Sequence, residues 1–155
     1  MSERSSGILL ALAAVLWVVW GLVHAMAGTL VILGDAQSGF QAIADGVQPE
    51  MLTAQYHPAV GAVLNQHAWN LLWGGLVTII GAVFIWKRNK TAIWVTAMVG
   101  GLLDIGYFVF MDLGGYVRFL PGTLMTIVSA TAIIASFAVL FSRPAAGPAS
   151  PNQSG

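Results

Sequence analysis

Apolar residues run along most of this chain in four long blocks, which short polar stretches separate. A helix that crosses the hydrocarbon core of a membrane needs about 20 mostly apolar residues. Blocks of that length lie at about residues 7–33, 59–86, 91–111 and 119–141. The pattern predicts an all-α membrane protein in which residues 1–142 form a single domain, a four-transmembrane-helix bundle.

The polar stretches between the blocks carry charges of opposite sign. The stretch at 34–58 holds Asp35, Asp45 and Glu50, whereas the turn "KRNK" at 87–90 holds three of the six basic residues. Because Lys and Arg gather on the cytoplasmic side of membrane proteins, we expect the basic turn inside and residues 34–58 outside, as an outer loop. Both termini then lie in the cytoplasm, an N-in/C-in arrangement, and we expect the membrane to be the plasma (inner) membrane of a bacterium.

The two ends of the chain differ from its middle. Arg4, the apolar run after it and "AMA" at 25–27 also fit a secretory signal peptide with a small-residue cleavage site. The run is longer than the ~7–15 apolar residues of such a peptide and continues past the site as "GTLVIL", which favours a spanning helix. Residues 143–155 are rich in Pro, Ala, Gly and Ser, which bury too little apolar surface to offset the entropy of ordering. A disordered cytoplasmic tail is therefore expected there.

The outer loop carries two signals for short helices. Ser38 and Gln41 match a capping box, and Pro49 followed by Glu50 suits a second helix start. Apolar residues recur at helical spacing after the first signal, so the two short helices are expected to lie in the membrane interface. They either cover the bundle or act as a lid over a ligand site.

Composition strengthens the membrane prediction and removes several classes of protein. The chain is 57% hydrophobic and 8% charged, against roughly 45–50% and 25% in soluble domains. Six basic and six acidic residues balance, so there is no basic face for nucleic acid. The chain has no cysteine, which excludes disulfides and thiolate metal sites. The expected partners are the lipid bilayer and, through the glycine-rich seams, a homodimer or a larger membrane complex.

A few polar residues interrupt the apolar blocks at similar depth. With a rise of about 1.5 Å per residue, three of them, His24, Asn70 and Tyr107, lie roughly 26 Å from the cytoplasmic ends of their helices. His67 lies about one turn further out and Asp104 about one turn further in. These five residues form a predicted binding layer in the outer leaflet.

Asp104 is the member of this layer that most needs an explanation. A central Asp costs about 2.5–3.5 kcal/mol on insertion scales, whereas hydrogen bonds between neutral groups such as His and Asn average only about 0.6 kcal/mol. Ionisable residues inside a membrane are functional candidates, and His24 or His67 is the natural partner across the bundle. A purely structural Asp–His contact is the plainer interpretation.

The polar layer allows three functions. The first is a ligand-binding or accessory and assembly bundle, with no catalytic residue assigned and enzyme activity left open. The second is a metal- or haem-binding redox protein or enzyme, with His24 and His67 as ligands to a metal ion or haem b and Asp104 as third ligand or orienter. The third is a small proton- or ion-coupled carrier in which Asp104 titrates against His24.

Overall fold

The structure is a computed structural model that describes residues 1–142. The predicted tail at 143–155 lies outside the described residues. Within 1–142 the chain is helical and contains no strand, which confirms the predicted all-helical fold. The elements, in chain order, are α1 (Glu3–Leu33), α2 (Ala36–Ile43), the 3-10 turn η1 (Pro49–Leu52), α3 (Pro58–Trp86), α4 (Lys90–Tyr107), the π-helical turns η2 (Phe108–Asp112) and η3 (Phe119–Thr123), and α5 (Leu124–Leu140).

Four helical segments are long and apolar enough to cross a membrane, as predicted. They are Glu3–Leu33, Pro58–Trp86, Lys90–Asp112 and Phe119–Leu140. The described chain thus has the helices of a small multi-pass integral membrane protein.

Polar side chains cap the long helices and set where they begin. α1 starts before the apolar block, at Glu3, because the Ser2 hydroxyl accepts a hydrogen bond from the Ser5 amide at 3.2 Å. His57 caps α3 by accepting from the Ala59 amide at 3.2 Å, directly before the proline that opens the helix. Each cap satisfies a backbone donor that has no partner within its helix.

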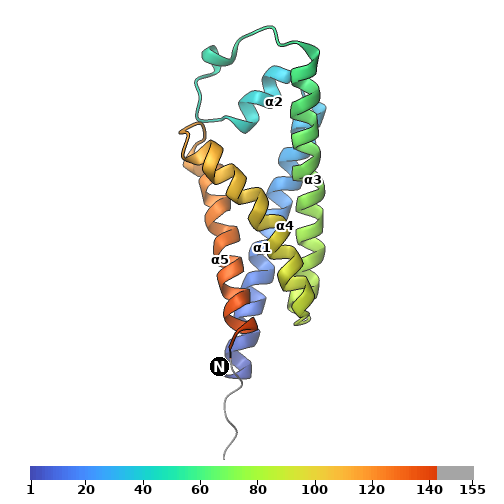
Figure 1. The fold of residues 1–155 in the computed structure, drawn as a ribbon, viewed down its shortest axis with the longest axis vertical. Coiled ribbons are helices and arrows are strands. Elements are labelled where there is room, and N and C mark those ends of the chain that lie inside the picture. Colours follow the sequence, from blue (N-terminus) through green and yellow to red (C-terminus); the bar gives the residue numbers. More distant parts are fainter. Residues whose placement is uncertain (143–155) are drawn as a thin grey trace, which may run out of the picture.

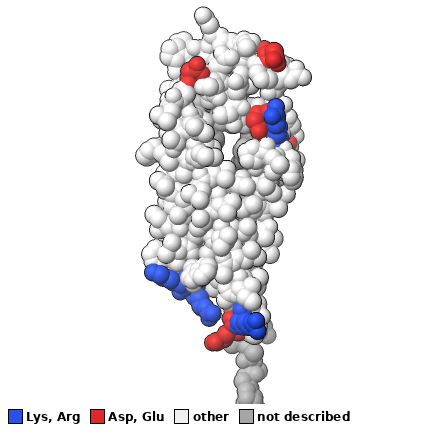
Figure 2. Space-filling view, turned by 180° about the vertical axis from the view of Figure 1, so that it is seen from behind, with Lys and Arg blue, Asp and Glu red and all other residues white. Residues whose placement is uncertain are grey.

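The four spans form a bundle in which α1 packs against α3 and α5, and α4 also packs against α3 and α5 (Figure 1). α1 begins and α5 ends at the same end as the α3–α4 turn, and α2 lies across the opposite end (Figure 1). We call the end with Lys87, Arg88 and Lys90 the basic end. The end with Asp35 and Asp45 is the acidic end. Between them the visible surface carries few charges (Figure 2).

Glycines bring the backbones of α1 and α3 into contact. A Cβ atom on Gly21 would lie 2.6 Å from the Gly75 carbonyl oxygen, and one on Gly75 would lie 2.5 Å from the Gly21 carbonyl oxygen. Real Cβ atoms do not approach so closely, so only glycine fits at this crossing. The small residues at this crossing therefore let the backbones of α1 and α3 approach closely.

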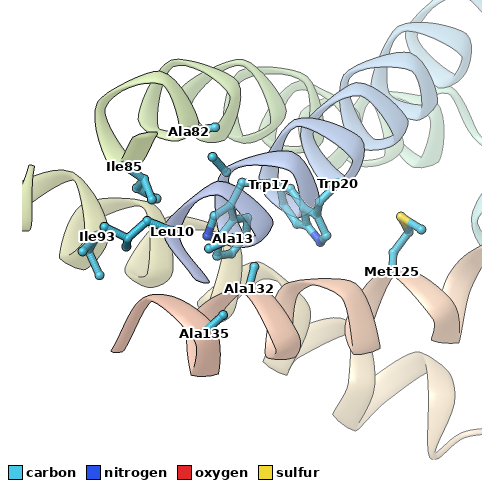
Figure 3. Close-up of a cluster of buried hydrophobic side chains, with 11 residues drawn as sticks. Leu10, Ala13, Trp17, Trp20, Ala82, Ile85, Ile93, Met125, Ala132 and Ala135 are labelled. Atoms are coloured by element: carbon cyan, nitrogen blue, oxygen red, sulfur yellow. The ribbon is translucent and has the colours of Figure 1, made fainter. Parts of the chain in front are cut away.

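Two tryptophans of α1 fill the centre of the bundle. Trp17 and Trp20 are fully buried, with ring centroids 5.8 Å apart in an edge-to-face arrangement. Their side chains project from α1 toward the other helices (Figure 3). The Trp17 ring packs on Gly100 of α4, where a Cβ atom would lie 2.6 Å from the ring carbon Cη2. The large Trp17 ring of α1 thus meets a glycine of α4, the helix diagonally opposite.

The outward faces of the helices are apolar. Trp86 and Trp94 are 62% and 53% exposed. Buried positions on the same helices are small, such as Gly81 and Ala97. Such a bundle is covered by hydrocarbon side chains outside and held together by small residues inside, as in membrane helices.

The outer-loop helix begins one turn earlier than its predicted cap. The capping box is formed by Asp35 and Ser38, not by Ser38 and Gln41: the Asp35 carboxylate accepts from the Ser38 amide at 2.8 Å, and the Ser38 hydroxyl accepts from the Asp35 amide at 3.0 Å. Asp precedes the first helical residue, Ala36, and a charged carboxylate is the better acceptor there. These bonds hold the pKa of Asp35 below its usual range.

Candidate ligand-binding cavity

A cavity of about 240 Å³ lies inside the bundle at its acidic end. Four of the five predicted layer residues line it together with one residue from the outer loop, and these five polar residues are His24, Asp45, His67, Asp104 and Tyr107. The remaining lining is apolar, from α1, α2, α3 and the start of α5, and includes Ala27, Val31, Ile43, Leu71, Pro121 and Met125. We call this the polar cavity.

Asn70 is the predicted layer residue that does not line the polar cavity. Its side-chain oxygen accepts a hydrogen bond from Trp73 Nε1 at 3.1 Å, on the same helix. Three residues turn an α-helix through about 300°, so Asn70 points about 60° away from the direction of His67. That angle is enough to place it beside the exposed Trp73 instead of inside the bundle.

Asp104 lies on α4 and is held by a tryptophan from α1. Trp20 Nε1 donates a hydrogen bond to Asp104 Oδ2 at 2.8 Å, across the bundle. The Trp20 ring also stacks on His24, with centroids 3.6 Å apart and an angle of 18° between the planes. Trp20 therefore positions both partners of the contact between His24 and Asp104, whose atoms Nε2 and Oδ1 are 3.7 Å apart.

The protonation of His24 follows from its hydrogen bond to the backbone. The Trp20 carbonyl can only accept, so His24 Nδ1, at 2.8 Å, carries a hydrogen and donates to it. In a neutral imidazole the other nitrogen, Nε2, is then an acceptor, and it faces Asp104 Oδ1, which is also an acceptor. These two atoms leave a position between them that suits a hydrogen-bond donor.

His67 and Tyr107 complete the polar lining from α3 and α4. His67 is half-buried, and within the described chain its ring makes no hydrogen bond. Tyr107 lies against Gly122, where any larger residue would collide with the phenol. Both side chains thus border the cavity without being tied to a neighbouring polar group in the part of the protein described.

The outer loop closes the acidic end of the cavity. Asp45 accepts a hydrogen bond from the Arg118 amide at 2.8 Å, and the Gly46 amide donates to the Tyr116 carbonyl at 2.9 Å. These bonds tie the segment after α2 to the loop between α4 and α5. In the described chain Arg118 forms no ion pair with Asp112, and the Asp112 carboxylate accepts a hydrogen bond from the Thr123 hydroxyl.

The cavity opens on the side of the bundle. Met26 and Leu30 of α1 line it and are 59% and 60% exposed, and Pro121 of η3 is exposed as well. The surface is hollowed in this region, beside a basic and an acidic side chain (Figure 2). Because these rim residues are apolar, the entrance faces the same surroundings as the lipid-facing surface.

The predicted metal-ligand set is not assembled around one point. Among residues 1–142, no group of three or more His, Asp or Glu side chains is placed to hold a metal ion. His24 stacks on Trp20, and its Nε2 lies 3.7 Å from Asp104 Oδ1. The geometry therefore gives no support to His24 and His67 as ligands to metal or haem, and that role stays a prediction.

Comparison with known proteins adds no family to this description, because no family model, curated protein or solved structure matches the chain. The class that the fold defines is a helical bundle with four candidate membrane spans. Any function has to be argued from the polar cavity itself.

Sequence reasoning missed two residues of the site. Trp20 is the first of them, and it lies four residues before His24 and so shares its helix face. Asp45 was assigned to the outer loop by charge, and only the folding of that loop over the bundle brings it to the cavity. The first could have been found from helical spacing, but the second depends on contacts between distant segments.

Proposed function

We propose that this protein is an integral membrane protein that binds a small, largely apolar ligand in the polar cavity. The observation that carries the proposal is one cavity with an apolar wall, a polar group of His24, His67 and Asp104, and an apolar side entrance. Small-molecule sites have this composition, an apolar lining with a few polar groups that orient the ligand. We further propose that the basic end is cytoplasmic and that the membrane is a bacterial plasma membrane.

Binding suits the cavity better than passage through the bundle does. Trp17 and Trp20, both fully buried, occupy the centre of the bundle between the cavity and the basic end. A carrier would have to move both rings to connect the two ends. A ligand that enters from the side and is held above Trp20 needs no such rearrangement.

The proposal is tested with two tritiated probes that share one apolar body, 4-phenylbutanol and 4-phenylbutylamine. Their binding is measured to the protein in phosphatidylcholine nanodiscs, and uptake by empty nanodiscs is subtracted. We expect saturable binding of at least one probe, at one site per chain. Absence of saturable binding by both would overturn the proposed function.

A matched pair of variants places the bound probe. Ala27 lines the cavity, so Ala27→Phe fills it, whereas Ala62 of α3 is exposed and does not line it. We expect Ala27→Phe to abolish saturable binding and Ala62→Phe to retain it. Equal binding by the two variants would show that the probe lies elsewhere.

A further inference from the structure

We infer that the polar cavity selects a cationic ligand, a protonated amine on an apolar body. This inference rests on the proposed function and adds the chemical class of the ligand. It follows from the kind of polar atoms that line the cavity, from their separation and from the charges around them.

Hydrogen-bond acceptors dominate the polar lining. Asp104 and Asp45 supply carboxylates, and a neutral His24, whose Nδ1 donates to the Trp20 carbonyl, presents Nε2 as an acceptor. Lys and Arg are absent from the residues that line the cavity in the described chain. A ligand that donates hydrogen bonds and carries positive charge is complementary to this lining, whereas an anion or a ligand with acceptors alone is not.

The spacing of two acceptors fits one ammonium group. His24 Nε2 and Asp104 Oδ1 are 3.7 Å apart, so a nitrogen about 2.8 Å from each, the usual length of a charge-assisted hydrogen bond, lies between them. A protonated amine has the several N–H donors that this position requires. Its apolar body then lies toward Ala27 and Met125 on the apolar wall.

A cation would also balance the charge of the site. Asp104 is 4% exposed, and the indole of Trp20, which donates a hydrogen bond to it, is neutral. A carboxylate in such surroundings is costly without a positive partner. Because the medium is of low polarity, attraction between Asp104 and a bound ammonium is much stronger than in water.

The test compares the two probes, which differ only in an ammonium or a hydroxyl at one end. In phosphatidylcholine nanodiscs near pH 7 the amine is protonated, as a lysine side chain is. We expect wild-type protein to bind 4-phenylbutylamine about tenfold or more tightly than 4-phenylbutanol, the size of effect that a hydrogen bond to a charged group gives. The Asp104→Asn variant should remove that preference, since Asn still accepts from Trp20 but carries no charge.

A second variant keeps the inference testable if Asp104→Asn does not fold. Asp45→Asn lies at the acidic end of the cavity and retains an oxygen that accepts from the Arg118 amide. We expect it to weaken binding of the amine several-fold more than it weakens binding of the alcohol.

The outcomes separate this inference from the proposed function. Equal affinity of wild-type protein for both probes, or a preference for the amine that survives in both Asn variants, overturns the cationic ligand but leaves a binding cavity. Saturable binding of neither probe overturns both.

Discussion

Trp20 is the residue that joins the two helices of the site. It donates to Asp104 Oδ2 at 2.8 Å and stacks on His24. Replacing it by Phe keeps a stacking ring but leaves that carboxylate oxygen without its donor. The contribution of the indole N–H is therefore separable from that of ring packing.

We expect Trp20→Phe to lower the free energy of unfolding by about 1–3 kcal/mol, the cost of a buried acceptor that loses its partner. In an Asp104→Leu background, which has no carboxylate, the same substitution should cost less. The difference is measured by a double-mutant cycle, with unfolding in mixed micelles followed by circular dichroism. An equal cost in both backgrounds would mean that the hydrogen bond contributes nothing to stability.

Gly100 is required for a different reason, which is space for Trp17. Because a Cβ atom at Gly100 would collide with the Trp17 ring, Gly100→Ala should destabilise the protein by about 1–3 kcal/mol. Gly106 lies on the same helix, where a Cβ atom would meet no described atom within 4 Å. Gly106→Ala should therefore be neutral or stabilising by up to about 1 kcal/mol. Thermal unfolding midpoints in detergent compare the two, and equal losses would contradict the packing argument.

At the scale of single elements, α2 contributes Ala42 and Ile43 to the lining of the cavity. Its first turn depends on the bonds between Asp35 and Ser38. Asp35→Ala should increase amide hydrogen exchange in the first turn of α2 by roughly fivefold, whereas Asp35→Asn, which also caps helices, should change it little. Unchanged exchange in the Ala variant would show that packing alone orders the turn.

The same cap has a defined dependence on pH. Because hydrogen bonds hold the pKa of Asp35 below its usual range, the carboxylate stabilises the folded form. This contribution is complete above the unfolded pKa of about 3.9 and is lost as the pH falls through the lower, folded value. The Asp35→Asn variant lacks a titrating group, so its α2 helicity should not show this acid transition when both are followed by circular dichroism.

The elements were more predictable from sequence than the directions of their side chains. Long apolar blocks fix the number of spans, since a span needs a minimum length of hydrocarbon. The depth of His67 and Asn70 along α3 predicts one shared layer. Depth does not give the direction of a side chain around the helix axis, and Asn70 points away from the cavity. The observed cap at Asp35 differs from the predicted one because Ser38 and Gln41 fit the usual sequence pattern, whereas the reciprocal partner of Asp35 is Ser38, which that pattern does not include.

At the scale of the whole molecule, the cavity depends on contacts that no local pattern encodes. The outer loop reaches the α4–α5 loop through the Gly46–Tyr116 and Asp45–Arg118 hydrogen bonds. A Cβ atom on Gly46 would lie 2.8 Å from the backbone of Val117, so any side chain at position 46 would collide with the α4–α5 loop. Closure of the acidic end together with an apolar side entrance makes the membrane the expected route for a ligand.

The side of the membrane toward which the closed acidic end faces depends on the topology, and the basic turn at 87–90 predicts that the acidic end lies outside. The chain has no cysteine, so Gln55→Cys before α3 and Thr91→Cys in the first turn of α4 each introduce a single, exposed thiol. In intact bacterial cells that express the variants, a membrane-impermeant maleimide should label Gln55→Cys. It should label Thr91→Cys only after the membrane is permeabilised. The reverse pattern would place the basic end outside and turn the cover of the cavity toward the cytoplasm.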